Sequence, residues 1–426
     1  MSTAFTERLL QEHAALRVSL PDSIVPAAVR DASLKRAAET GLPGLRDEGW
    51  RYADLRPLLT ATLGTAQAPS ETDSARALLP SALEGIHRLV YVNGRFAPTL
   101  SAESGALSGL AVQGATLAAT NCVAATADER FAWLNDAFAV DGAQYTVRGE
   151  QQLELLFVTV PTTSAGASHP RISLALEAGA RLTLVERHVG GSEGGLVNVL
   201  VQCHLGRDAT LEHTRLQDST RGTIFLDSLL VRLDAGSHYD LTQLQLGAAT
   251  ARSALRIDLD GEAAHVDLRA LSLTDARRVH DMTIQVTHRG RQTKSEQLLR
   301  AIAKDRSGTS FASRVDVAST AGGADSQQSL KGLLADAGAE VNLRPQLEIS
   351  TDEVKASHGA TTGALDDTML FYLLSRGLDP QTARQLLEWA FLEDVISRIG
   401  RPELRRQVEL ATLDHLGNTA AEEALR

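Results

Sequence analysis

The sequence is poor in cysteine and in aromatic residues. Its two cysteines, Cys122 and Cys203, stand far apart in 426 residues, so we expect no disulfide framework. Phe, Trp and Tyr make up 4% of the chain, which argues against a stacking platform for single-stranded nucleic acid or glycans. Acidic residues outnumber Lys and Arg, and the net charge of −11 disfavours contact with phosphate backbones. We therefore expect no nucleic-acid partner.

Long apolar runs are also absent. No stretch approaches the roughly 18 uninterrupted apolar residues of a transmembrane helix, so we expect no membrane partner. The opening MSTAFTERLLQEHAAL mixes acids with bases and lacks the apolar core of a secretory signal. These features predict a cytoplasmic protein.

The common catalytic motifs are missing as well. The chain has no GxxxxGK[ST] phosphate loop, no GxSxG nucleophile elbow, and neither HExxH nor CxxC. Ser, His and Asp residues are numerous, but no motif fixes a geometry among them. We therefore assign no catalytic residue and expect that the protein is not an enzyme.

The N-terminal region, residues 1–144, is predicted to be mostly helical. TERLLQEHAAL (6–16) and VRDASLKRAAETG (29–41) carry apolar residues at three- and four-residue spacing. ADERFAWLNDAFA (127–139) predicts a further helix. RLVYVNGRF (88–96) predicts a strand that turns at Asn93 and Gly94.

From 145 to 349 the pattern changes to short alternating runs that are separated by glycine turns, which is typical of strands. Similar turns recur at Gly179, Gly206, Gly236 and Gly261, and again at Gly338. The first four follow one another at an interval that fits one coil of a parallel β-helix, a repeat architecture. An antiparallel β-sandwich is the alternative, but its turns would come closer together. We predict a mainly β protein with a β-helix core.

Residues 350–426 are predicted to form a C-terminal helical domain. LDDTMLFYLLSRG (365–377), PQTARQLLEWAFLEDVISRIG (380–400) and PELRRQVELATLDHLG (402–417) are the expected helices, and Asp379 and Pro380 supply a helix start. The second helix carries an apolar stripe at helical spacing. Its members are Leu386, Leu387, Ala390, Phe391, Val395 and Ile399. This pattern alone fits either internal packing or a docking surface.

The chain has 12 histidines, and neutral imidazole is a good ligand for iron or zinc. His358 is the candidate ligand, since it follows the last predicted strand and precedes Gly359, where a partner or cofactor can approach the backbone. Histidines within strand patterns are interpreted as structural. These include His204, His213, His238 and His265. Cys122 and Cys203 are interpreted as small buried hydrophobic residues.

Three segments resemble a known family. Residues 281–311, 345–378 (PQLEISTDEVKASHGATTGALDDTMLFYLLSRGL) and 383–396 are similar to the shared core of the SufB/SufD family of the SUF iron–sulfur assembly system. GWRYADL (49–55) and LNDAFAVDG (134–142) are similar to the SufD branch of that family. The resemblance spans most of the chain.

The resemblance implies a right-handed parallel β-helix with helical ends, working in a complex of SufB, SufD and two copies of the SufC ATPase. It implies that the C-terminal helices dock a SufC-type ABC ATPase, with Leu387, Phe391 and Val395 as partner-binding residues. It also implies that the end of the β-helix pairs with a SufB-type paralogue. The protein would then be a non-catalytic scaffold.

The family resemblance gives His358 a role at a nascent iron–sulfur cluster or iron, bound transiently and shared with the SufB-type partner. Family members commonly have a cysteine two residues before this histidine, where the present chain has Ala356. A thiolate is the usual ligand of such clusters. Any thiolate at this site must therefore come from the partner.

Two alternatives remain open at this stage. One is a homodimeric scaffold of the same family that works without SufB, although Ala356 would deprive both copies of a thiolate there. The other is a β-helix enzyme acting on polysaccharide. The few aromatic residues and the opening without signal character count against it.

Overall fold

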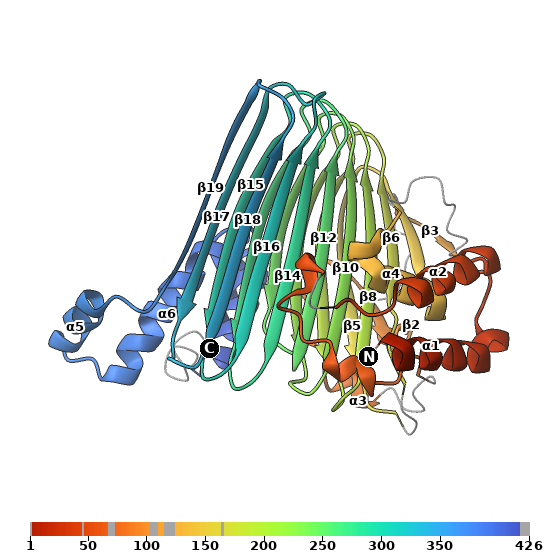
Figure 1. Ribbon diagram of the computed structural model, residues 1–426, viewed down its shortest axis with the longest axis horizontal. Coiled ribbons are helices and arrows are strands. Elements are labelled where there is room, and N and C mark those ends of the chain that lie inside the picture. The colour runs from red at the N-terminus through yellow and green to blue at the C-terminus, as the bar shows by residue number, and fades with distance from the viewer. Residues whose placement is uncertain are drawn as a thin grey trace.

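The computed structural model describes residues 2–44, 47–66, 73–101, 110–114, 124–162 and 166–417. Within these residues two sheets face each other along the whole molecule (Figure 1). The odd-numbered strands β5 to β19 form one sheet with β1 and β2, and the even-numbered strands β4 to β18 form the other with β3. The chain alternates between the sheets, so each pair of strands completes one coil. The predicted parallel β-helix with helical ends is confirmed.

The strands lie between residues 87 and 363. Their bounds are β1 His87–Val92, β2 Arg95–Phe96, β3 Leu110–Gly114, β4 Ala143–Val147, β5 Glu150–Thr159, β6 Arg171–Leu176, β7 Arg181–Gly190, β8 Leu196–Leu205, β9 Thr210–Ser219, β10 Ile224–Leu233, β11 His238–Gln245, β12 Thr250–Leu259, β13 His265–Thr274, β14 Val279–His288, β15 Lys294–Ala303, β16 Gly308–Val317, β17 Ala324–Leu334, β18 Glu340–Ile349 and β19 Val354–Gly363.

The helices lie at the two ends of the chain. The α-helices are α1 Ser2–Leu16, α2 Ala27–Thr40, α3 Asp73–Arg76, α4 Arg130–Phe138, α5 Asp367–Ser375, α6 Pro380–Ile396 and α7 Pro402–Leu416, and the 3-10 helices are η1 Arg17–Ser19, η2 Glu48–Trp50, η3 Arg56–Leu59 and η4 Ala127–Glu129. The Asp379 side chain caps α6 by accepting from the backbone N–H groups of Gln381 and Thr382, as its sequence predicts. Among the described residues, none of the helices combines the length and apolar character needed to span a bilayer.

Successive coils stack in register. His238 of β11 pairs with His265 of β13 on the next coil, and Lys294 of β15 pairs with Asp325 of β17 in the same way. In a parallel pair, registered residues point to the same side of the sheet, so each column of side chains is either inside or outside. Inside, Leu, Val and Ile from both sheets make the largest hydrophobic cluster. These aliphatic side chains form the core of the β-helix.

Glycines sit where the turns of neighbouring coils touch. A Cβ on Gly261 would overlap the backbone nitrogen of Ala235, and one on Gly290 would overlap the carbonyl of Gly261. Gly179, Gly206, Gly236 and Gly261 all lie at the corner that leads from an even strand to the next odd strand. Gly338 lies at the opposite corner, between β17 and β18. The five turns that the sequence suggests as one series therefore belong to two different corners of the coil.

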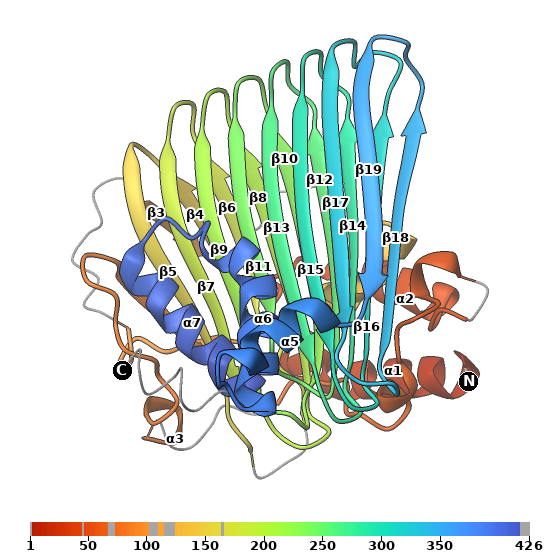
Figure 2. The same ribbon diagram turned by 90° about the vertical axis from the view of Figure 1, so that its left-hand side faces the viewer.

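Helices cover both outer faces. Helix α4 packs on β8 and β10, where Phe131 and Leu134 join Leu226 in one cluster. Helices α6 and α7 lie across the lower part of the odd-numbered sheet in Figure 2, where Leu392 and Val408 pack with Leu271. Each helical end of the chain thus shields a different sheet.

Two predicted boundaries need adjustment. The N-terminal region holds a hairpin of β1 and β2 that turns at Asn93 and Gly94 as predicted, and β1 joins the odd-numbered sheet beside β5. The expectation that strands end at 349 is wrong, because β19 continues the β-helix to Gly363. Nine of its ten residues are exposed. Because β19 faces no core, it lacks the alternating apolar residues by which a strand is recognised in a sequence.

The packing of the corners predicts a position-specific effect of glycine replacement. Gly261→Ala should lower the free energy of unfolding by about 1–3 kcal/mol, since the methyl group forces neighbouring coils apart. Gly308→Ala is the matched control, because nothing lies within 4 Å of its added Cβ. Denaturant melts of both variants check this. Equal midpoints for the two would show that the corners tolerate a side chain.

Candidate functional site

The last coil of the β-helix is an open end. In the described part of the chain, β18 and β19 are the final strands of their sheets, and each is ten residues long. None of the residues of β18 is buried. Long exposed edges present backbone N–H and C=O groups to any chain that can pair with them, and folded proteins normally protect such edges. This end is therefore a surface suited to a partner.

His358 lies in the middle of β19. The expectation that it follows the last strand is wrong, because β19 extends to Gly363. His358 is in register with Gln328 of β17, whose side chain is 4% exposed and faces the interior. His358 therefore points to the interior side of the coil, yet it is exposed because no further coil covers it. Ala356 aligns with the buried Ser326 and shares this face.

The interior beneath His358 is polar. Gln328 Nε2 donates to Ser313 Oγ at 2.8 Å, and the Ser313 hydroxyl donates to Gln297 Oε1. One column away, the Ser295 hydroxyl donates to Ser326 Oγ at 2.9 Å. Earlier coils hold mostly aliphatic side chains at their centre. Polar side chains thus lie directly beneath the open end, where an apolar surface would be left in water.

The donor set at this end is incomplete for a metal or cluster. His358 offers one imidazole, and Ala356 offers nothing. Cys203 is buried in β8 at 2% exposure, as predicted, and Cys122 lies outside the described residues. The three-donor group found in the described part of the chain lies elsewhere and does not include His358. An iron or cluster held at His358 therefore needs ligands from a second chain.

The apolar stripe of α6 divides into a buried and an accessible part. Val395 and Ile399 are 0% and 2% exposed and belong to the cluster beneath the helix. This places Val395 in the chain's own core, out of reach of a partner. Leu387 and Phe391 are half-buried, and Leu386 is 43% exposed. Internal packing is therefore confirmed for Val395 and Ile399, whereas a docking role for the accessible members stays a prediction.

Leu387 and Phe391 open onto a pocket of about 310 Å³ between α6, α5 and the ends of β17 and β19. Leu365, Leu333 and Met369 are among its other lining residues. Lys304 and Glu388 form an ion pair at 2.7 Å that fixes α6 beside β15, so this wall of the pocket is held in place.

Helix α5 is apolar but has no buried residue. Met369, Phe371 and Tyr372 are 58%, 72% and 55% exposed, and Figure 1 shows the helix standing away from the sheets. Exposed apolar clusters of this kind mark interaction sites. The sequence contained a signal that was missed: LFYLL is apolar around the whole helix, whereas a helix on a protein surface has one apolar face.

A second group of titratable side chains lies inside the β-helix. Arg215 of β9 donates to Glu186 of β7 at 2.6 Å and to Asp227 of β10 at 2.8 Å. His188 and His213 also contact the Glu186 carboxylate, at 2.6 and 3.1 Å. Burial alone would raise the pKa of Glu186, but the Arg215 guanidinium holds it well below its usual range. Burial lowers the pKa of His213. Such a paired, enclosed group is suited to holding coils together.

Similar proteins point to one family. The family described as "SUF system FeS cluster assembly, SufBD core domain" matches residues 158–391. An iron–sulfur cluster assembly SufBD family protein of Synechocystis is 31% identical over 84% of this chain and 84% of its own length. The iron–sulfur cluster assembly protein SufD of Escherichia coli is 29% identical over 88% of this chain and 89% of its own. A SufBD family protein of Mycobacterium tuberculosis is 26% identical, with the same two shares.

The contrast between core and accessible apolar residues is testable on stability. Val395→Ala should lower the free energy of unfolding by about 1–3 kcal/mol, because it removes buried methyl groups. Phe371→Ala, at an exposed position, should change it by less than about 0.5 kcal/mol. Thermal melts of the isolated chain measure both. A large loss for Phe371→Ala would mean that α5 is part of the core.

Proposed function

Because the chain belongs to the SufBD family of the SUF iron–sulfur cluster assembly system, we propose that it is a non-catalytic scaffold subunit of a SufBCD-type complex. In this complex it pairs with a SufB-type paralogue through the open end of the β-helix and docks a SufC-type ABC ATPase through its C-terminal helices. The nascent cluster is the cargo of the complex.

The exposed terminal coil is the observation that carries the proposal. β18 and β19 leave two ten-residue edges and a polar interior open at one end. A paralogue with the same fold can pair its own last strands with these edges, which extends both sheets and buries the exposed backbone groups. Backbone pairing of this kind needs matching geometry more than matching side chains, so two related β-helices are suitable partners.

His358 then lies at the junction of the two chains. It contributes an imidazole, and the partner contributes the thiolate that Ala356 cannot supply. The work is thus divided: this chain positions one nitrogen ligand or proton acceptor, while sulfur chemistry belongs to the cysteine-bearing chain. The incomplete donor set supports a site shared between subunits.

The ATPase surface follows from the C-terminal helices. The sequence has no phosphate loop of its own, so nucleotide hydrolysis requires another subunit. The exposed apolar residues of α5, together with Leu387 and Phe391 of α6, offer an apolar surface and a pocket for that subunit. Helix α6 is tied to the sheet by ion pairs such as Arg300–Asp394 at 2.6 Å, so movement of a docked ATPase can reach the β-helix.

A homodimer through the same end is the second candidate, since two copies can also pair their open edges. In a homodimer two imidazoles but no thiolate of this motif would meet. Co-purification from the native source distinguishes the two: a cysteine-bearing paralogue in stoichiometric amount supports the heteromeric complex. A polysaccharide-active enzyme is disfavoured by the family match.

His358→Ala should leave the assembled complex and its thermal midpoint nearly unchanged, with less than about 1 kcal/mol lost, but should lower its iron and sulfide content. Ser357→Ala is the matched control. Ser357 is next to His358 on β19 but is in register with the exposed Gln327 of β17, so it lies on the outer face. Ala356→Cys should raise the sulfide retained, since it adds a thiol on the His358 face. Wild-type iron and sulfide in His358→Ala would rule out the ligand or relay role.

Phe371→Asp should weaken binding of the ATPase about tenfold or more, because it places a charge in an apolar contact. Phe391→Asp tests the neighbouring part of the surface, predicted from the sequence. Val18→Asp is the control: Val18 is a fully exposed apolar residue at the opposite end of the chain. Titration calorimetry with the purified ATPase gives the affinities. If both helix variants bind like Val18→Asp, the docking surface lies elsewhere.

A further inference from the structure

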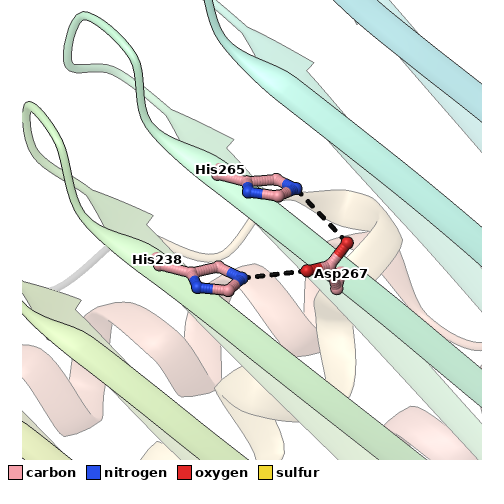
Figure 3. Close-up of side chains that lie close together, drawn as sticks. All are labelled: His238, His265 and Asp267. Carbon is pink, nitrogen blue, oxygen red and sulfur yellow. Dashed lines mark hydrogen bonds and ion pairs between the residues drawn. The ribbon is translucent and has the colours of Figure 1, made fainter. Parts of the chain in front are cut away.

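Two histidines and an aspartate meet on the outer face of the odd-numbered sheet, far along the chain from His358 (Figure 3). His238 begins β11 and His265 begins β13, and the two are in register. Asp267 stands on β13 on the same side as His265, one step further on. His238 Nε2 is 2.9 Å from one Asp267 oxygen, and His265 Nε2 is 3.3 Å from the other.

The two imidazoles are held parallel to one another. Their ring centroids are 4.6 Å apart, with an angle of 9° between the planes. Each ring turns its Nε2 toward the same carboxylate (Figure 3). The spacing of the rings follows from the spacing of strands, because registered neighbours in a sheet are about 4.8 Å apart. The backbone of β11 and β13 therefore sets the positions of two of the three donors.

The group is accessible in the folded chain. The side chains of His238, His265 and Asp267 are 37%, 35% and 20% exposed. The helices α6 and α7 cover the other ends of these strands, where Leu244 and Leu271 are buried beneath them. An ion from solvent can thus reach the three donors without any rearrangement of the helices.

The charges around the group favour a cation. Glu212, Asp240 and Glu296 align with Asp267 along the same outer row. Arg269 forms an ion pair with Asp240. Lys294 is in register with His265 on the neighbouring strand, and Asp325 is in register with Lys294 in turn. Acidic side chains therefore outnumber basic ones along this part of the outer face.

We propose that His238, His265 and Asp267 form a binding site for a first-row divalent transition metal ion such as Zn²⁺ or Fe²⁺. Neutral imidazole and carboxylate suit these ions, and two histidines with one carboxylate leave coordination positions open for water or another ligand. The donor atoms all lie within 4.8 Å of one another. Metal–ligand distances of about 2.0–2.2 Å can be reached from there by small side-chain rotations.

The site is independent of the proposed cluster assembly, since it uses neither His358 nor the open end. It offers the isolated chain a metal-binding function. Their strand patterns predict a structural role for both histidines. The signal that was available is their separation by one coil of the β-helix, together with the HxD pattern that each begins, HYD at 238–240 and HVD at 265–267.

The test uses the full chain, free of any affinity tag and without its partners. Titration with Co²⁺ followed by visible absorption, and with Zn²⁺ by calorimetry, should show one equivalent bound. His265→Ala and Asp267→Asn should each weaken binding at least tenfold, and the thermal midpoint measured without metal confirms that both variants are folded.

His204→Ala is the matched control, because His204 on β8 makes a single imidazole–carboxylate contact, with Asp234 at 3.1 Å, and has no second histidine beside it. It should bind one equivalent with wild-type affinity, as should His358→Ala. Failure of the wild-type chain to bind either ion would overturn the proposal. So would binding by folded His265→Ala that equals wild type. Neither result bears on cluster content in the assembled complex.

Discussion

In-register pairing between successive coils is the constraint on which the rest of this structure depends. Once the backbone of one coil is hydrogen-bonded to the next, every side chain is committed to the inside or the outside and to one column. The aliphatic core, the close contact of Gly261 with Ala235 and the stacking of His238 on His265 all follow from it. The same rule turns His358 toward the interior side of a coil that nothing covers.

The open end and the C-terminal helices give the molecule two kinds of accessible surface. The end of the β-helix exposes backbone edges and polar side chains, whereas α5 exposes apolar side chains on a short helix. These surfaces suit different partners, one that extends a sheet and one that covers aromatic and aliphatic groups. In the proposed function each surface serves a different protein, and α6 packs on α5 as well as on β13 and β15.

The sequence predicts this fold well wherever a residue type has one physical meaning. Glycine at a turn between coils is one example, and Asp379 at a helix start is another. The first predicts the coils of the β-helix, and the second predicts the start of α6. Prediction failed where burial decided the outcome. Val395 and Phe391 share one stripe, but only the sheet beneath determines which of them is covered. β19 has no core to face, so its sequence lacks the alternation by which strands are recognised. The contact of His238 with Asp267 depends on the register between coils, so the two HxD patterns indicate it only once the length of a coil is known.

The charged group inside the β-helix has a further consequence for how the chain folds. Successive coils of a repeat architecture are similar to one another. If all were lined only with aliphatic side chains, a coil could pair with the wrong neighbour at little cost. Arg215 meets two carboxylates, from β7 and from β10, only when the coils engage in the native order. If the coils paired one repeat out of register, Arg215, Glu186 or Asp227 would be buried without its counter-charge, at a cost of several kcal/mol. The network thus disfavours out-of-register pairing of the coils, and the register in turn determines which coil forms the open end.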